Sequence, residues 1–189
     1  MITSTQSFLF KVATYGMSYA FIHWDARDGE AVGANPDDPE QLLFLGNVVM
    51  DQVPAFELAV QPSAANMQTA RWAVRTTLML REDVWDRWDV EVEGGATRSI
   101  TQDVQALGNQ STQEVAVGEW VEVHQLWHIP SKAVPKGLVL TWTGTRVLEK
   151  KAFPYDHGRL PFVQCDLLPG LVGREGRTWV NDLIPMQID

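Results

Sequence analysis

Two histidines four residues apart, His124 and His128, have the spacing of a metal-binding pair on a helix. The segment that contains them, residues 119–129, alternates apolar and polar side chains instead, which is typical of a strand. At about 3.3 Å per residue the two rings would lie roughly 13 Å apart, too far to share a zinc ion whose ligands lie about 2 Å away. The pattern therefore favours surface or interface histidines, and we predict no metal site.

Three glycines, Gly170, Gly173 and Gly176, precede a predicted helix start, where backbone N–H groups can hold an anion. Three residues with donor groups share this loop: Arg174, Arg177 and Thr178. Neither the phosphate-loop motif nor the dinucleotide-binding motif is present, however. Glycines required for turns and close packing explain the loop better, and we predict no cofactor.

The turn PYDHG places Asp156 beside His157, a pair that could serve nucleophilic catalysis. The chain has no Gly-x-Ser-x-Gly motif to supply the nucleophile, and no two carboxylates form a recognisable acid–base pair on opposed strands. We therefore expect a protein without enzymatic activity. A hydrolase that uses Asp156 and His157 near the glycine loop remains the alternative, and a free-standing β-rich binding module is a third possibility.

Composition and charge narrow the class of protein. The 189 residues fit a single domain, 1–189, and one cysteine excludes an internal disulfide. The chain has 15 Lys and Arg and 24 Asp and Glu, which gives a net charge of −9. This charge argues against tight nucleic-acid binding, but it allows DNA to slide past without adhering. No apolar run approaches the ~20 residues that span a bilayer, and no signal peptide is evident, so we expect a cytoplasmic origin and no membrane partner.

The periodicity predicts more strands than helices. Helical spacing covers residues 4–19, with Gly16 near a possible end, and an acidic first turn favours a short helix over 81–88. Strands are expected in the remaining apolar segments: 20–24, 42–60 as two strands or one bent at Pro54, 71–80, 119–129, the hairpin 138–142 with 145–153, and 160–168. Neighbouring strands of this kind predict an α+β fold with a largely antiparallel sheet.

Two polar segments interrupt this pattern. Residues 25–41 are acidic and rich in turn formers, which predicts an exposed loop. Residues 91–118 are polar with weak periodicity, which predicts a mobile loop with one short helix around 100–107. The tryptophans within strands are expected in the core: Trp72, Trp120, Trp127 and Trp142.

Three stretches, in order, resemble portal proteins of tailed bacteriophages. These are FLFKVATYGMSYAFIHWD (8–25), VPAFELAVQPSAANMQTARWAVRTTLMLREDV (53–84), and EVHQLWHIPS with the later FPYDHGRLPFVQCDLLPG and DLIPMQ. The positions that match the family pattern are Tyr15, Gly16, Arg71, Trp72, Trp127, Pro130, Pro154, Tyr155, Gly158, Leu160, Pro161, Phe162, Pro169, Gly170, Asp182 and Gln187. In the family, these features belong to the wing-like α+β region and the start of the helix that follows it.

The resemblance implies a structural role without catalysis. Portal subunits form a homo-oligomeric ring, typically of twelve, at one capsid vertex of the virion, after synthesis in the bacterial host cytoplasm. Double-stranded DNA passes through the ring, driven by a terminase, and the other partners are capsid and tail adaptor proteins. Because portals are much longer, we expect this chain to be a fragment or truncated product whose last helix begins near Asp182 and continues past Asp189.

Overall fold

The computed structural model describes residues 4–26, 28–35, 38–93, 120–144 and 146–168, together with Gly176 and Thr178. The chain divides into two compact units. The terminal unit comprises Met1–Leu58, Pro62–Ala70 and Leu160–Asp189, and the central unit comprises Ala59–Gln61 and Arg71–Arg159. The single domain expected over 1–189 stays a prediction.

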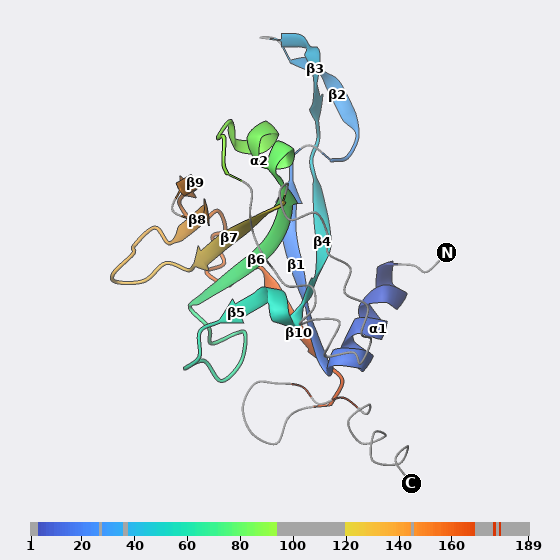
Figure 1. Ribbon diagram of the computed structural model, residues 1–189, viewed down its shortest axis with the longest axis vertical. Helices are drawn as coiled ribbons and strands as arrows, with labels where there is room; N and C mark the ends of the chain where they lie inside the picture. The colour runs from blue at the N-terminus through green and yellow to red at the C-terminus, as the bar shows by residue number, and fades with distance from the viewer. Residues whose placement is uncertain are drawn as a thin grey trace. The chain divides into compact units, whose positions relative to one another are not determined.

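The terminal unit is built on a three-stranded antiparallel sheet with the order β10-β1-β4. Helix α1 (Ser4–Tyr15) leads directly into β1 (Met17–Asp25), which pairs with β4 (Asn47–Pro54) and β10 (Phe162–Asp166). Between β1 and β4 the chain forms a second, two-stranded sheet of β2 (Ala31–Asn35) and β3 (Asp38–Phe44). Figure 1 shows this hairpin continuing from the ends of β1 and β4. A 3-10 turn, η1 (Ala55–Glu57), follows β4.

The large core side chains of the terminal unit lie on one face of this sheet, and Ser18 and Ala20 are buried on the other. Register pairs Tyr19 with Val53 and Phe21 with Phe162, and all four side chains are buried. The rings of Phe21 and Phe162 stack with centroids 4.9 Å apart. Alternate residues of β1 therefore hold the sheet together on this face.

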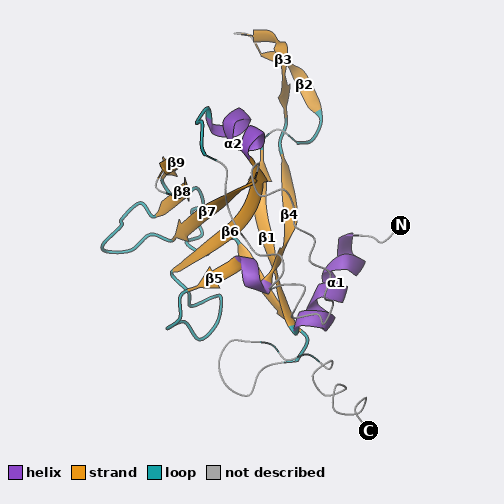
Figure 2. Ribbon diagram, viewed as in Figure 1, coloured by secondary structure: helices purple, strands orange, loops and turns teal. Residues whose placement is uncertain are grey.

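The central unit is a five-stranded sheet with the order β5-β6-β7-β8-β9 (Figure 2). Its strands are β5 (Leu58–Val60), whose first residue belongs to the terminal unit, β6 (Trp72–Leu80), β7 (Trp120–His128), β8 (Leu138–Thr143) and β9 (Arg146–Lys151). The pairs from β6 to β9 are antiparallel. Helix α2 (Arg81–Trp88) ends where Asp89 adopts φ 54° and donates its N–H to the Trp85 carbonyl at 2.7 Å.

One face of the central sheet supplies most of its buried side chains. Val84 of α2 and Val92 pack with Val121 and Val123 of β7. Further along the same face, Trp127 is buried beside its register partners Ala73 and Val139. The alternation predicted for residues 119–129 accounts for this face.

The α+β class with antiparallel sheets is confirmed, with 16% of the described residues helical and 48% in strands. Helix α2 has the predicted bounds 81–88, and β6, β7 and the β8–β9 hairpin lie where expected. The strand predicted at 160–168 is present as the shorter β10. The segment 42–60 is broken more often than expected, with Pro54 closing β4.

One local prediction holds in part and another is wrong. The predicted helix begins at Ser4 and ends at Tyr15, directly before Gly16 (φ 80°), the expected possible end, but Tyr19 lies in β1 instead of on the helical face. The acidic segment 25–41, expected to be a loop, contains β2 and most of β3. Proline has no backbone N–H to donate, so it is tolerated in strands that have an edge without a pairing partner. Both strands of a two-stranded sheet are of this kind, which allows Pro39 in β3.

The tryptophan prediction holds only in part. Trp127 is buried, whereas Trp72, Trp120 and Trp142 are half-buried, since they alternate out of phase with the buried residues of their strands. The short helix expected around 100–107 lies outside the described residues. Neither helix in the described part of the chain has the length and apolar character required to cross a membrane.

Candidate interaction surface

The face of β1 and β4 opposite the core carries a stripe of exposed apolar side chains. Ile22 pairs with Met50 and Trp24 with Val48, so all four point to the same side of the sheet. Their exposed fractions are 40%, 46%, 55% and 62%, respectively. We call these four residues the apolar stripe. Contiguous apolar surface of this kind on a folded protein marks a site of contact with another molecule.

The stripe exists because β1 has large apolar side chains on both faces. Tyr19 and Phe21 are buried on the core face, while Ile22 and Trp24 are exposed on the outer face, with the polar His23 between them in sequence. When one face of a sheet is solvated, its apolar side chains lie mainly on the other, buried face. The exposed Ile22 and Trp24 depart from this rule, which makes the outer face a candidate contact surface.

The hairpin β2–β3, which we call the arm, continues this apolar character. Val32 in β2 and Phe44 in β3 are exposed, as are Leu43 and Leu45. An isolated two-stranded hairpin is marginally stable in water. The arm consequently combines weak intrinsic stability with exposed apolar side chains.

Close glycine contacts join the arm to the sheet. Leu45 donates its N–H to the Glu30 carbonyl at 3.0 Å, which closes the base of the hairpin. Gly46 has φ 76°, and a Cβ at this position would overlap the Trp24 ring. Gly46 thus allows the indole of the apolar stripe to lie directly against the backbone at the base of the arm.

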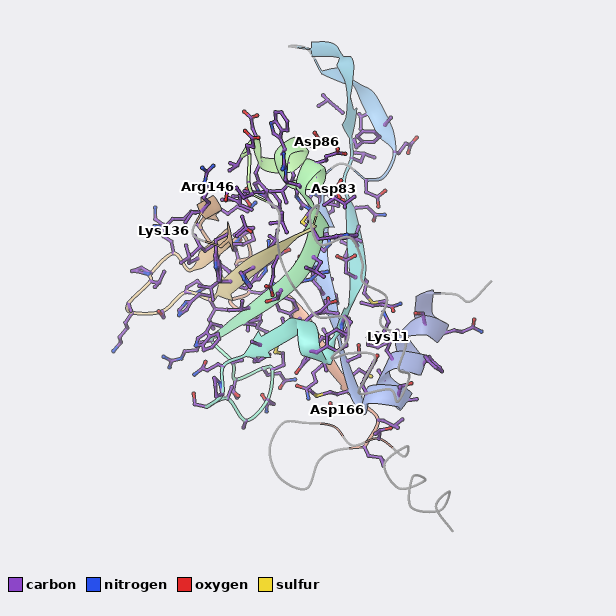
Figure 3. All side chains as sticks on the ribbon, in the orientation of Figure 1. Lys11, Asp83, Asp86, Lys136, Arg146 and Asp166 are labelled. Carbon is purple, nitrogen blue, oxygen red and sulfur yellow. The ribbon has the colours of Figure 1, made fainter. Side chains whose placement is uncertain are left out.

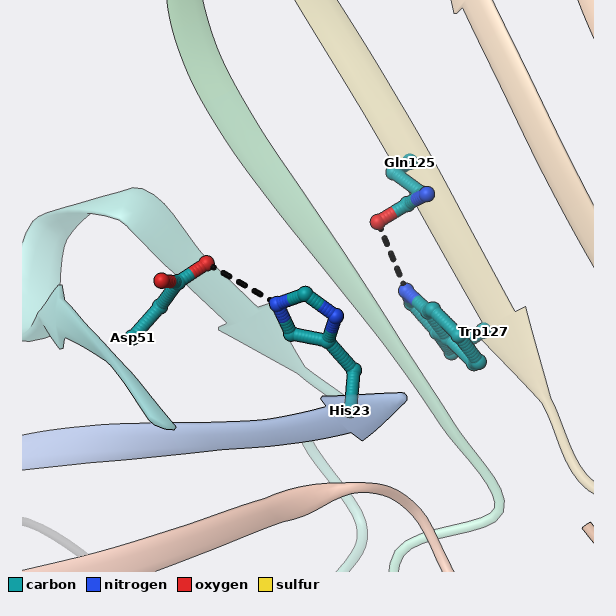
Figure 4. A network of polar contacts seen from close by, with 4 residues as sticks. All are labelled: His23, Asp51, Gln125 and Trp127. Carbon is teal, nitrogen blue, oxygen red and sulfur yellow. Dashed lines mark hydrogen bonds and ion pairs between the residues drawn. The ribbon is translucent and has the colours of Figure 1, made fainter. Parts of the chain in front are cut away.

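The core face of the same sheet contains one polar pair. His23 Nε2 lies 3.3 Å from Asp51 Oδ2, as Figure 4 shows. The imidazole also stacks on Phe21 with centroids 4.6 Å apart. Both contacts orient the His23 ring, and the Asp51 carboxylate can accept a hydrogen bond from it.

The first family-motif positions, Tyr15 and Gly16, lie at the junction of α1 and β1. Tyr15 packs edge-on against Phe56 with centroids 5.8 Å apart. The Gly16 carbonyl accepts a hydrogen bond from the Leu167 N–H at 2.9 Å. A Cβ on Gly176 would overlap the Gly16 carbonyl, so close packing explains this member of the glycine loop.

Thr178, considered as a donor for a bound anion, has a different role. Its hydroxyl donates to the Ala13 carbonyl near the end of α1 at 2.6 Å, and the side chain is buried. Gly170, Gly173, Arg174 and Arg177 lie outside the described residues. Pro169, Asp182 and Gln187 of the family pattern lie outside them as well.

A second group of motif positions forms an aromatic stack in the central unit. Trp127 donates its indole N–H to Gln125 Oε1 at 2.9 Å (Figure 4) and stacks on Tyr155 at an angle of 11°. Tyr155 stacks on His157 with centroids 5.3 Å apart, and Phe153 packs edge-on against Trp127 and Tyr155. The stack fixes the segment that follows β9 against β7.

Hydrogen bonds to the backbone connect other motif positions. The Arg71 N–H donates to Gln61 Oε1 at 2.8 Å, and its carbonyl accepts from the Ile129 N–H at 3.0 Å. In the terminal unit the Pro161 carbonyl accepts from the Ile22 N–H at 2.8 Å. The other motif positions occupy structural places: Trp72 opens β6, Pro130 and Pro154 are exposed, Gly158 has φ 62°, and Leu160 and Phe162 are buried.

The residues considered for catalysis or metal binding are dispersed. His124 and His128 lie on β7, where His124 Nδ1 is 3.1 Å from Thr76 Oγ1. His157 is exposed, and its Nδ1 accepts the Arg159 N–H at 3.0 Å. Within the described residues, no three His, Cys, Asp or Glu side chains gather in an arrangement that could hold a metal ion.

Comparison with known protein families yields no match for this chain, and comparison with curated proteins yields none either.

Proposed function

We propose that this protein is a structural subunit that assembles with copies of itself, as a portal or head–tail connector ring at the capsid vertex of a tailed bacteriophage. The observation that carries the proposal is the apolar stripe Ile22, Trp24, Val48 and Met50, together with the exposed arm beside it. Subunit interfaces have apolar, aromatic centres, and Trp24 and Met50 belong to the residue types enriched there.

The assignment to the portal class is supported by the ordered resemblance of three sequence stretches. Its first stretch contains the α1–Gly16–β1 junction and part of the apolar stripe. The net charge of −9 suits a conduit that DNA passes without being held, because anionic surfaces repel the phosphate backbone. In this proposal the ring guides DNA during packaging and ejection, while capsid, terminase and tail adaptor proteins bind its outer surfaces.

The test is the size and shape of the protein expressed from its complete gene. Light scattering should give a discrete oligomer, and electron micrographs should show rings with a central hole. A monodisperse monomer at all concentrations up to about 100 µM, well above a typical dissociation constant for a stable interface, would overturn the proposal. A monomer that hydrolyses a test substrate would favour the alternative that uses Asp156 and His157, and an inactive monomer would favour a free-standing binding module.

A further inference from the structure

The segment that leads into the arm and continues to the start of β3 is acidic. Its sequence has six acidic residues and one basic residue between positions 25 and 40: Asp25, Asp28, Glu30, Asp37, Asp38 and Glu40, with Arg27. Asp28 and Glu30, which immediately precede β2, are exposed. Among the described residues, β2 and β3 pair only with each other, so each has one edge without a described neighbour.

The opposite charge lies along β9. Five exposed cationic side chains belong to β9 and to the loop before β8: Lys132, Lys136, Arg146, Lys150 and Lys151. Glu149 is the one acid between positions 131 and 151, and the Lys136 carbonyl accepts the Phe153 N–H at 3.1 Å, which holds the loop beside the end of β9. Figure 3 shows Lys136 and Arg146 in this part of the central unit. We call this group the cationic edge.

The cationic edge is an open sheet edge. Within the part of the chain that the structure describes, β9 is the last strand of the order β5-β6-β7-β8-β9 and pairs with β8 alone. An edge strand of this kind presents backbone N–H and C=O groups with which a further strand can pair, and lysines on such an edge discourage indiscriminate pairing. Val147 on β9 is 58% exposed and adds an apolar contact point.

We infer that the arm of one copy pairs with the cationic edge of the next copy, so that β2–β3 extends the five-stranded sheet. This inference rests on the self-association proposed above and adds a second contact to the one proposed for the apolar stripe. Main-chain hydrogen bonds would supply affinity, as in strand addition generally, and the charges would select the partner.

Charge determines which pairing is favoured. Contact between two arms would bring acidic side chains together, and contact between two cationic edges would bring lysines together. Both arrangements are repulsive. Only the arm-to-edge arrangement combines opposite charges. Such a contact joins two different surfaces, and repetition of a contact of this type closes into a ring when its rotation allows.

A charge-exchange experiment tests the inference. The first variant is Asp28→Lys with Glu30→Lys, and the second is Lys136→Glu with Lys150→Glu. The first variant reduces the net charge of residues 25–40 from −5 to −1, and the second reduces that of the cationic edge from +4 to 0. Either change removes most of the attraction between opposite charges, and we expect at least a tenfold rise in the concentration required for half-assembly, measured by light scattering. When the variants are mixed in equal amounts, the unchanged arm of the second variant meets the unchanged edge of the first, so the two variants should associate with each other as pairs at concentrations where each alone is a monomer.

The control is Asp83→Lys with Asp86→Lys on the exposed side of α2, which changes the net charge as much as the first variant does (Figure 3). This control should assemble like the unchanged protein. Circular dichroism and thermal unfolding check that each variant folds. Where one does not, the neutral pair Asp28→Asn with Glu30→Gln should weaken assembly by a smaller factor.

The outcomes separate the two proposals. Unimpaired assembly of both charge variants, or folded variants that fail to associate on mixing, would refute the arm-to-edge contact and leave self-association intact. Failure of the unchanged protein to assemble would refute the proposed function, and this contact with it.

Discussion

Replacement of Trp24 by alanine should prevent assembly while leaving the subunit folded. Trp24 has the largest side chain of the apolar stripe, and 55% of its surface is exposed in the single chain. It lies over Gly46 at the base of the arm, so its position is fixed before any partner binds. A rigid aromatic group in the centre of a contact surface is typical of an interface hot spot.

The expected loss of binding free energy follows from the exposed area of the Trp24 side chain. An aromatic side chain of this size buries up to about 250 Å², so 55% exposure leaves roughly 140 Å² available to a partner. At about 25 cal/mol per Å², complete burial of that area would contribute about 3.5 kcal/mol per contact. Loss of this contribution weakens each contact roughly 300-fold. In a ring, every subunit loses it, so the assembled fraction should fall steeply.

Sedimentation velocity over a range of protein concentrations measures this change. The matched control is Trp85→Ala, because Trp85 on α2 is also 55% exposed but belongs to the central unit, whereas the apolar stripe belongs to the terminal unit. Trp85→Ala should assemble normally. Equal assembly of Trp24→Ala and the unchanged protein, or equal loss in both variants, would refute the assignment of the apolar stripe as the subunit contact.

Three further predictions concern stability and the hydrolase alternative. Gly137→Ala should destabilise the central unit by about 2–4 kcal/mol, measured by urea unfolding. The reason is that Gly137 has φ 63° and that an added Cβ would lie 2.5 Å from Phe153 Cβ. A loss of stability below about 0.5 kcal/mol would contradict that geometry. Val53→Ala should cost about 1–3 kcal/mol because Val53 is fully buried, whereas Val163→Ala, at an exposed position, should change stability by less than about 0.5 kcal/mol. His157→Ala should leave assembly unchanged and lower the melting temperature by only a few degrees, since the ring lies at an exposed turn and stacks on one side. Loss of a measured hydrolytic activity in this variant would instead support the hydrolase alternative.

The central unit was largely predictable because its signals agree with one another. In β7 the alternation of Val121 and Val123 with polar neighbours matches the buried face, and the acids Glu82 and Asp83 begin α2 where a helix favours negative charge. Gly144 marks the turn between β8 and β9 with φ 48°. In each case local sequence and burial favour the same structure.

The terminal unit was harder to predict because two of its signals conflict. Tyr19 continues the four-residue spacing from Tyr15, but the positive φ of Gly16 ends the helix between them. The arm is acidic and contains prolines, and these features are typical of loops. The side chains described in its strands, at positions 31–33 and 43–44, are all exposed, so no buried face among them imposes alternation.

The apolar stripe shows why composition alone did not reveal the candidate contact. Ile22 and Trp24 have the alternation of core residues, and one chain's sequence does not distinguish a face covered by its own fold from a face covered by a neighbour. The distinction comes from the register, which places Met50 and Val48 beside them on the face opposite Tyr19 and Phe21. A sheet whose two faces are both apolar requires two coverings. The chain's own core supplies one, and a neighbouring copy is the partner that a ring of subunits would supply for the other.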